Sequence, residues 1–363
     1  MKHYFKKDFN KHGGDIYSFS DNGNEIIDFS ANISPLGLPI AVKNDIINSL
    51  DSCDKYPDIN CTKLCKSLGE YYNLPKDYFY IGNGAGDIIF RFVKSINIKK
   101  ALILAPTFSE YSLACSIENA EIINYILKEQ DDFAVKSDII DYIDDKTDAV
   151  FICNPNNPTG KITDKNNLID ILKKCNQIGA FLFLDECFLD FTGEEERLSC
   201  LDLCSEYKNL IILKAFTKIY AMAGIRLGFA VTSNKNLIQN LKNCGQPWNV
   251  SAVAQIAGVS ALKQEDYKNA VIDLIKTERT FLKCGLENLG LKVFSSYANY
   301  ILFRNTSKKK NLKSELLKYG ILIRSCENYI GLDEKFYRVA VKNHKDNQKL
   351  LQCLEKVVNE WSY

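Results

Sequence analysis

The chain has 363 residues, of which 46% are hydrophobic and 25% charged, and its 46 lysines and arginines nearly balance 45 aspartates and glutamates. This composition excludes global disorder and collagen-like repetition. The net charge of +1 gives no electrostatic reason to expect nucleic acid or an anionic membrane as a partner. The length predicts two subdomains, or one large α/β unit with an appendage.

The N-terminus and the cysteines indicate the compartment. Residues 1–15 have no apolar core behind their basic residues, and no segment approaches the roughly 20 apolar residues of a membrane span. We therefore expect no secretory signal, no membrane contact and a cytoplasmic location. The thirteen cysteines are an odd count in a long chain, which favours small buried residues over a disulfide framework. The three histidines lie far from the paired cysteines, so we expect no metal site.

The elements expected in the first two thirds of the chain are those of an α/β sheet. The first 40 residues are rich in turn-forming steps and indicate an arm rather than a core. Short apolar runs then alternate with amphipathic segments such as 165–177, which predicts a mostly parallel sheet with helices on both faces. The runs expected as buried strands are 101–105, 149–153, 181–185, 210–214 and 227–231.

The last third of the chain is typical of a smaller α+β unit. Residues 250–290 carry a long helical pattern, and shorter segments follow it. We expect a large domain over residues 46–259, with the arm (1–45) and a small C-terminal domain (260–363) forming the second unit. The shorter segments are an amphipathic stretch at 311–319 and apolar runs at 299–304, 320–324 and 336–341.

Polar residues follow three of the apolar runs, at the strand ends where parallel sheets bind ligands. CNPNNPTG (153–160) follows the run 149–153, and Asp185 ends the run 181–185. Lys218 and Arg226 come after the run 210–214. Taken singly, each has an ordinary explanation: a turn-rich loop, a helix cap or a surface lysine. Their order along one sheet edge, together with the glycine-rich segment 82–87 before a helix, instead indicates one cofactor site.

These residue types match the needs of an aldehyde cofactor that carries a pyridine ring and a phosphate. Lys218 can bind the aldehyde as an imine and later move protons. A carboxylate such as Asp185 keeps the pyridine nitrogen protonated, because the pyridinium ring is the electron sink. The backbone N–H groups of residues 82–87, at the start of a helix, can bind the phosphate.

The chain resembles the fold-type I, pyridoxal-phosphate-dependent enzymes of the class I/II aminotransferase superfamily. NNPTG (156–160), Asp185 and the segment 218–226 carry this resemblance, which runs from about residue 12 to residue 342. Within the superfamily the chain is most similar to the L-threonine-O-3-phosphate decarboxylases of cobalamin biosynthesis, and the histidinol-phosphate aminotransferases are near relatives. The most specific feature is Phe188, which stands where aminotransferases typically have a tyrosine whose hydroxyl bonds the cofactor's 3-oxygen.

The resemblance implies a role for each matching cofactor residue. Lys218 forms the imine and Asp185 bonds the pyridine nitrogen, while Asn157 bonds the 3-oxygen. Either Phe108 or Tyr111 stacks on the cofactor ring, and the sequence leaves this choice open. The phosphate is expected to contact Gly84, Ala85, Gly86, Thr217 and Arg226, with Tyr56 reaching it across the interface of a homodimer.

The resemblance also implies a small phospho-amino acid as the substrate. Arg338 corresponds to the superfamily's carboxylate-binding arginine, and Arg324 to the arginine on the phosphate side. His12 and Asn32 are expected to close over the substrate phosphate, with Asn157 also touching the substrate. The implied reaction is decarboxylation of L-threonine O-3-phosphate, and the alternative is transamination of histidinol phosphate.

The sequence departs from the family at two positions near the cofactor phosphate. Gly86 and Ala215 stand where the family usually has side chains that form hydrogen bonds. Each lost hydrogen bond is worth roughly 0.5–1.5 kcal/mol, or up to about 3 kcal/mol when one partner is charged. We therefore expect weaker retention of pyridoxal phosphate than is usual for the family.

Overall fold

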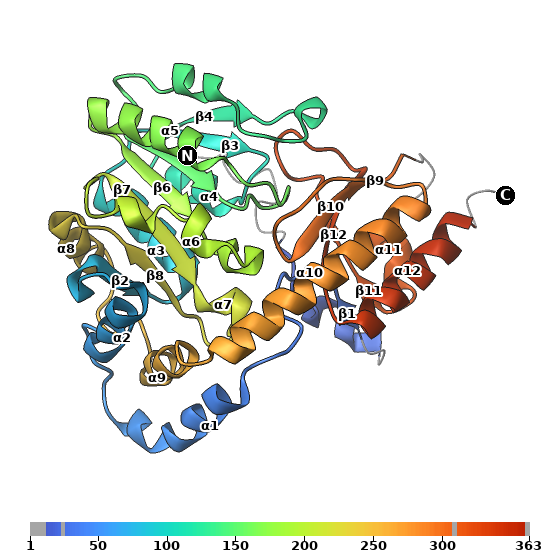
Figure 1. Ribbon diagram of the computed structural model, residues 1–363, viewed down its shortest axis with the longest axis horizontal. Helices are drawn as coiled ribbons and strands as arrows, with labels where there is room; N and C mark the ends of the chain where they lie inside the picture. The colour runs from blue at the N-terminus through green and yellow to red at the C-terminus, as the bar shows by residue number, and fades with distance from the viewer. Residues whose placement is uncertain (1–11, 23–25, 307–310, 360–363) are drawn as a thin grey trace.

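The computed structural model describes residues 12–22, 26–306 and 311–359. Within them the larger unit is built on a seven-stranded sheet with the strand order β2-β8-β7-β6-β5-β3-β4 (Figure 1). The strands are β2 (Phe79–Gly82), β3 (Lys100–Ala105), β4 (Glu121–Ile126), β5 (Ala149–Cys153), β6 (Phe181–Asp185), β7 (Leu210–Ala215) and β8 (Gly228–Val231).

The five apolar runs expected as strands are all present, as β3 and β5 to β8. The central strands read as continuous apolar runs because helices cover both of their faces, which removes the alternation of an exposed sheet. The sequence did not single out β2 and β4, which lie at the two edges of the sheet. Figure 1 shows the helices packed around this sheet and the smaller unit beside it.

One strand departs from the parallel arrangement. Strand β8 is antiparallel to both of its neighbours, and Gly228 lies opposite Ala215 at the end of β7. The chain therefore turns back at the carboxyl end of β7 instead of crossing the sheet. This return keeps the whole connecting segment, with Lys218 and Arg226, at the edge where β5 and β6 also end.

The helices are well delimited by local signals at several ends. Asp164 caps α5 by accepting the N–H of Asn166, and Gly179 ends that helix with a φ of 78° that favours glycine. No helix in the described ranges is long and apolar enough to cross a membrane. The helices are α1 (Ile40–Asn48), α2 (Thr62–Tyr72), α3 (Gly84–Ser95), α4 (Glu110–Ile117), α5 (Lys165–Ile178), α6 (Glu195–Leu198), α7 (Phe216–Ile219), α8 (Lys235–Asn243), α9 (Ala252–Ala261), α10 (Glu265–Asn288), α11 (Leu312–Leu317) and α12 (His344–Asn359).

The smaller unit is an antiparallel sheet in the order β12-β13-β10-β9, to which the N-terminal arm is attached. Strand β1 (Ile27–Asp28) pairs in parallel with β11 (Ile321–Leu322), so the arm lies against the C-terminal part of the chain. Helix α10 runs between the two units (Figure 1). The remaining strands are β9 (Lys292–Val293), β10 (Tyr300–Arg304), β12 (Arg324–Ser325) and β13 (Phe336–Ala340).

The division of the chain at residues 45/46 and 259/260 stays a prediction. The sheet pairings support it, since the large sheet uses strands between residues 79 and 231 and the smaller sheet uses strands between 292 and 340. Both proposed boundaries fall inside helices, namely α1 and α9.

A buried ion cluster joins the start of α10 to strand β7. The Nζ atom of Lys214 lies 2.6 Å from a carboxylate oxygen of Glu195 and 3.7 Å from one of Glu186. The Nζ atom of Lys268 lies 2.8 Å from the other oxygen of Glu195 and 3.0 Å from Asp190. Two cations thus neutralise most of the charge of three carboxylates, and they fix the strand that leads into the candidate site.

Candidate active site

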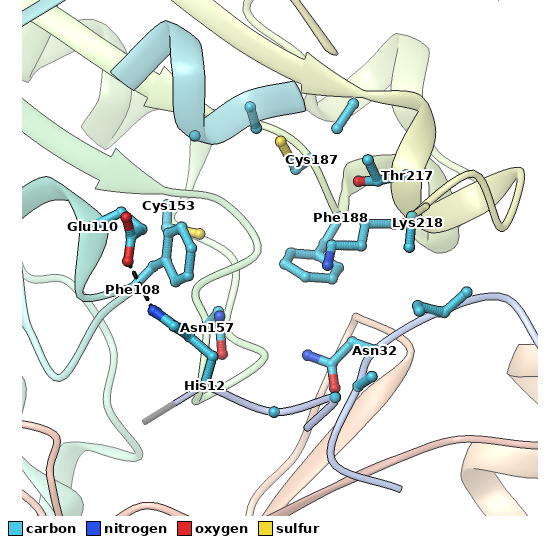
Figure 2. Close-up of a pocket in the computed structure, with 18 of the residues that line it drawn as sticks. His12, Asn32, Phe108, Glu110, Cys153, Asn157, Cys187, Phe188, Thr217 and Lys218 are labelled. Carbon is cyan, nitrogen blue, oxygen red and sulfur yellow. Dashed lines mark ion pairs between the residues drawn. The ribbon is translucent and has the colours of Figure 1, made fainter. Parts of the chain in front are cut away.

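A cavity of about 480 Å³ opens where the carboxyl ends of β5, β6 and β7 face the arm and the smaller unit (Figure 2). Most residues singled out in the sequence meet there. Gly84, Tyr111 and Tyr56 do not line it. The singled-out residues that do line it are His12, Asn32, Ala85, Gly86, Phe108, Asn157, Asp185, Phe188, Ala215, Thr217, Lys218, Arg226, Arg324 and Arg338.

Lys218 lies in the short helix α7, directly after β7, and its side chain ends inside the cavity. Burial lowers the pKa of its ammonium group, and the positive charges of Arg338 and Arg226 lower it further. The backbone N–H of Ser34 in the arm donates to the Lys218 carbonyl oxygen at 3.0 Å. The lowered pKa favours the neutral amine, which is the form that attacks an aldehyde.

Asp185 ends strand β6 and is held rigidly. The Cys187 backbone N–H donates to one carboxylate oxygen at 2.9 Å, and the Tyr111 hydroxyl donates to the other at 2.5 Å. Burial raises the pKa of Asp185. A cation placed against the carboxylate would favour its charged form, and a protonated pyridine nitrogen is such a cation.

The start of α3 and Arg226 meet at one end of the cavity, with groups suited to an anion. Gly84 has a φ of +81°, and a Cβ atom there would come within 2.7 Å of an Arg226 guanidinium nitrogen, so the close approach requires glycine. The first N–H groups of α3 and the Arg226 side chain thus meet at one place, with Thr217 nearby in the lining. Such an arrangement binds phosphate. A Cβ at Gly86 would meet nothing within 4 Å.

The two candidate stacking residues have different positions. Phe108 lines the cavity, whereas Tyr111 is fully buried behind it, with the ring centres 5.7 Å apart and the rings nearly perpendicular. Tyr111 instead stacks on Phe151 at 5.5 Å and uses its hydroxyl for Asp185. The geometry therefore favours Phe108 as the ring that faces a flat cofactor.

Two buried arginines from the smaller unit form the opposite wall. Arg338 donates to the Ser30 carbonyl oxygen at 2.7 Å and to the side-chain oxygen of Asn157, while its Nε has no hydrogen-bond partner among the described residues. Arg324 donates at 2.7 Å to the Ser325 carbonyl oxygen and at 2.7 Å to Asn328. Because Arg338 uses the Asn157 oxygen, the amide nitrogen of Asn157 is left as a donor toward a ligand.

The arm closes the cavity from below in Figure 2. A Cβ on Gly13 would lie 2.0 Å from the Ser30 carbonyl oxygen, and the Gly14 N–H donates to the Ser30 hydroxyl at 2.7 Å, so this crossing is tight. The buried side-chain oxygen of Asn32 has no partner among the described residues. His12 lies at the mouth, with Nε2 3.0 Å from a carboxylate oxygen of Glu110.

Sequence reasoning missed several residues of the lining. Glu110 lies in the segment that was read only for its aromatic residues, and Cys153 and Cys187 were treated as core filling. Tyr329 was not singled out either, and its ring centre lies 5.3 Å from the Arg324 guanidinium carbon. The position of Glu110 between the two candidate stacking residues, Phe108 and Tyr111, was the one available signal.

Tyr56 lies away from the cavity of its own chain. Its side chain is 81% exposed and stacks on Trp248, with ring centres 4.7 Å apart. Its expected contact with a cofactor phosphate in a second protomer therefore stays a prediction. In the part of the chain that the structure describes, no group of three or more His, Cys, Asp or Glu residues is arranged to hold a metal ion.

The residues of the cavity fit pyridoxal phosphate. A buried amine (Lys218), a fixed carboxylate (Asp185), an aromatic wall (Phe108) and an anion-binding helix start with Arg226 surround one space of suitable size. Asn157 presents a donor between them. This fold and this set of groups are those of a pyridoxal-phosphate-dependent enzyme.

Comparisons with known proteins agree with this class of enzyme. Residues 24–355 match the family Aminotransferase class I and II, and the chain belongs to this family. The chain is similar to the threonine-phosphate decarboxylase of Salmonella typhimurium, with 33% identity over 96% of each protein. It is also similar to the histidinol-phosphate aminotransferase of Methanococcus aeolicus, with 30% identity over 94% of this chain and 92% of the relative.

A solved structure gives the same answer for the fold. The histidinol-phosphate aminotransferase from Clostridium acetobutylicum matches with a TM-score of 0.85 and 35% identity, over 92% of this chain and 99% of that one. The predicted fold-type I architecture and the predicted cofactor, pyridoxal phosphate, are confirmed. When bound, the cofactor supplies an electron sink for a bond broken at the substrate Cα.

Proposed function

We propose that this enzyme decarboxylates L-threonine O-3-phosphate to (R)-1-aminopropan-2-ol O-phosphate and carbon dioxide, in cobalamin biosynthesis. The observation that carries the proposal is the pair of buried arginines, Arg324 and Arg338, in the same cavity as Lys218. A substrate with one carboxylate and one phosphate matches two guanidinium groups, because each can bind an oxyanion through two N–H groups. The 33% identity to a threonine-phosphate decarboxylase along nearly the whole chain supports this choice.

The arginines would determine which bond at Cα reacts. The group that leaves Cα would depend on how these residues orient the substrate against the cofactor. Arg338 is tied to Ser30 and Asn157, so it offers a fixed site for the substrate carboxylate. Held there, the carboxylate would be the group lost as carbon dioxide, and the bound cofactor would supply the sink for the bonding electrons. Lys218 is the group proposed to deliver a proton to Cα and complete the reaction.

Phe188 further supports decarboxylation over transamination. The centre of its ring lies 5.6 Å from the Nζ atom of Lys218, and the ring packs edge-on against that of Tyr300. The position that carries a hydroxyl in typical aminotransferases is therefore apolar, as in the phosphothreonine decarboxylases that the chain resembles. Asn157 would then be the side chain that bonds the 3-oxygen of the cofactor.

Histidinol-phosphate aminotransferase is the second candidate function. The solved aminotransferase at 35% identity supports it, and the same lysine, aspartate and cofactor would serve both reactions. The two reactions differ in what leaves Cα, which is carbon dioxide in one case and a proton in the other. Their products therefore separate them directly.

The deciding experiment compares both substrates on one preparation of cofactor-loaded protein. One reaction contains L-threonine phosphate and is followed for carbon dioxide, and the other contains histidinol phosphate with 2-oxoglutarate and is followed for glutamate. We expect carbon dioxide and no glutamate. Glutamate without carbon dioxide would leave the cofactor assignment intact and replace the proposed reaction.

Arg324→Ala tests the phosphate side of the proposed site. We expect this variant to lose affinity for L-threonine phosphate, by a factor of about ten or more, and to bind unphosphorylated L-threonine almost as before. The control is Arg338→Ala, which should weaken both ligands because both carry the carboxylate. Equal losses for the two ligands in Arg324→Ala would remove its phosphate role.

We propose further that the enzyme is a cytoplasmic homodimer. The thirteen cysteines are all free thiols, which supports a reducing compartment. The exposed stack of Tyr56 on Trp248 supports an interface, since large aromatic side chains are enriched there. Sizing of the protein in solution tests the dimer, and Tyr56→Phe should weaken cofactor retention if the hydroxyl reaches a phosphate in the second protomer.

A further inference from the structure

Glu110 is an unexpected residue in a cavity that takes anions. Among the described residues, the lining contains two carboxylates, Asp185 and Glu110. Asp185 is accounted for by the pyridine nitrogen of the cofactor. Glu110 has no such partner in the cofactor, and its negative charge lies beside the arm, where the substrate phosphate would bind if the proposed function holds. An uncompensated carboxylate there would repel the substrate.

The compensation is on the arm. Glu110 is the first residue of α4, and its carboxylate lies 3.0 Å from the Nε2 atom of His12 (Figure 2). The Glu110 side chain is only 15% exposed, while that of His12 is 44% exposed at the cavity mouth. The His12 ring also lies against Phe108, with ring centres 6.1 Å apart. The imidazole is therefore held between a carboxylate and the ring that faces the cofactor.

The two nitrogens of an imidazole then have different tasks. Glu110 can only accept, so Nε2 of His12 must carry the hydrogen of this contact. In a neutral ring the other nitrogen, Nδ1, would be an acceptor and could not donate to a phosphate oxygen. A ring that donates to Glu110 and to a phosphate at once must be protonated on both nitrogens.

We propose that Glu110 is a positioning residue for phosphate recognition. Its carboxylate orients His12 and supplies the counter-charge of the doubly protonated ring, so that the Nδ1–H of His12 donates to the phosphate of the substrate. Glu110 itself touches neither substrate nor cofactor. This inference rests on the proposed function only in requiring a phosphomonoester substrate, which L-threonine phosphate and histidinol phosphate both are.

A simpler role for Glu110 must be separated by experiment. An acidic residue in the first turn of a helix interacts favourably with the helix dipole, and this alone would affect stability. That role does not involve His12, whereas the proposed role acts through it. The two roles therefore differ in whether the effects of the two residues are coupled.

The test is a double-mutant cycle with Glu110→Gln, His12→Gln and the double variant, all loaded with cofactor. Dissociation constants for inorganic phosphate are measured by calorimetry, and kcat and KM for L-threonine phosphate by carbon dioxide release. We expect each single variant to raise KM and the dissociation constants by about tenfold, with kcat changed much less. Because Glu110 acts through His12, the double variant should bind no more weakly than His12→Gln alone.

Two controls keep the result interpretable. Binding of unphosphorylated L-threonine should not change in any variant, and Glu118→Gln, at the other end of α4 and outside the cavity lining, should bind like the wild type. Additive losses in the double variant, or binding to Glu110→Gln that is unchanged or tighter, would overturn the proposal.

The failure of the proposed function has a different signature. If the wild type releases no carbon dioxide, the same cycle is measured with histidinol phosphate, which also presents a phosphomonoester. The coupling between Glu110 and His12 then still decides this inference. Thermal unfolding of every variant identifies any that fails to fold. If His12→Gln fails to fold, His12→Asn replaces it in the cycle.

Discussion

A hydroxyl at position 86 is expected to tighten the binding of pyridoxal phosphate. Gly86 lies in the first turn of α3 and lines the cavity, and a Cβ atom there would meet nothing within 4 Å. Gly86→Ser therefore adds a donor beside the phosphate without displacing a neighbour. A hydrogen bond to a charged group is worth about 1.5–3 kcal/mol, which corresponds to a gain in affinity of roughly 10- to 150-fold.

The assay starts from apo protein. Pyridoxal phosphate is titrated into wild type, Gly86→Ser and Gly86→Ala while the visible absorbance of the lysine-bound cofactor is recorded. The alanine variant has the same backbone restriction but no hydroxyl, so it separates the hydrogen bond from the loss of glycine flexibility. The rise in unfolding temperature on adding cofactor provides a second measure of the same affinity.

The expected order of affinity is Gly86→Ser above wild type, with Gly86→Ala close to wild type. If the serine and alanine variants bind equally, the gain does not come from the hydroxyl. If neither differs from wild type, α3 does not present its first turn to the cofactor phosphate, and the placement of the anion-binding end is refuted.

Phe108→Leu should weaken cofactor binding, whereas Tyr111→Phe should leave cofactor binding nearly unchanged. Tyr111→Phe should instead lower the free energy of unfolding in urea by about 1–3 kcal/mol, because a buried oxygen of Asp185 loses its donor. The reverse pattern would make Tyr111 the stacking residue. Burial lowers the pKa of the Lys218 ammonium group below 10.5 in the folded apo protein. Between that lowered pKa and pH 10.5 the unfolded protein therefore binds more protons than the folded one. The contribution of this group to the free energy of unfolding rises with pH across that window. Apo Lys218→Met should therefore be more stable than apo wild type at neutral pH, with a difference that shrinks toward pH 10.5, and it should have no turnover. Lys268→Met should lower the free energy of unfolding by about 3–5 kcal/mol, because it leaves the three carboxylates of the buried cluster with one of their two cations. A loss under about 1 kcal/mol in denaturant melts would contradict this.

The cofactor half of the site was accessible to sequence reasoning because its residues lie directly after apolar strands. A strand buried on both faces is a continuous apolar run, so the positions of Asp185 and Lys218 at strand ends could be predicted without knowing the neighbours of each strand. Strand β4 escaped notice because it lies at an edge, where several of its residues are partly exposed and the apolar run is interrupted.

The substrate half depends on contacts between distant segments, and for these the sequence alone has no local signal. The contact of His12 with Glu110 and that of Arg338 with Ser30 both depend on where the arm crosses the sheet edge. The sequence left the choice between Phe108 and Tyr111 open for a related reason. Both lie in one short segment, and only the start of α4 determines which ring turns toward the cavity.

The pairing of β1 with β11 has a consequence for how the site is assembled during synthesis. Residues 27–28 leave the ribosome early, but their partners at 321–322 emerge only after the whole large sheet has been made. The sheet carrying Asp185 and Lys218 can fold first, as N-terminal segments generally do. The arm can pair with β11 only after residues 321–322 have been made, so the phosphate side of the cavity forms last. A chain truncated before residue 321 would lose that side of the site and keep the strands that hold the cofactor.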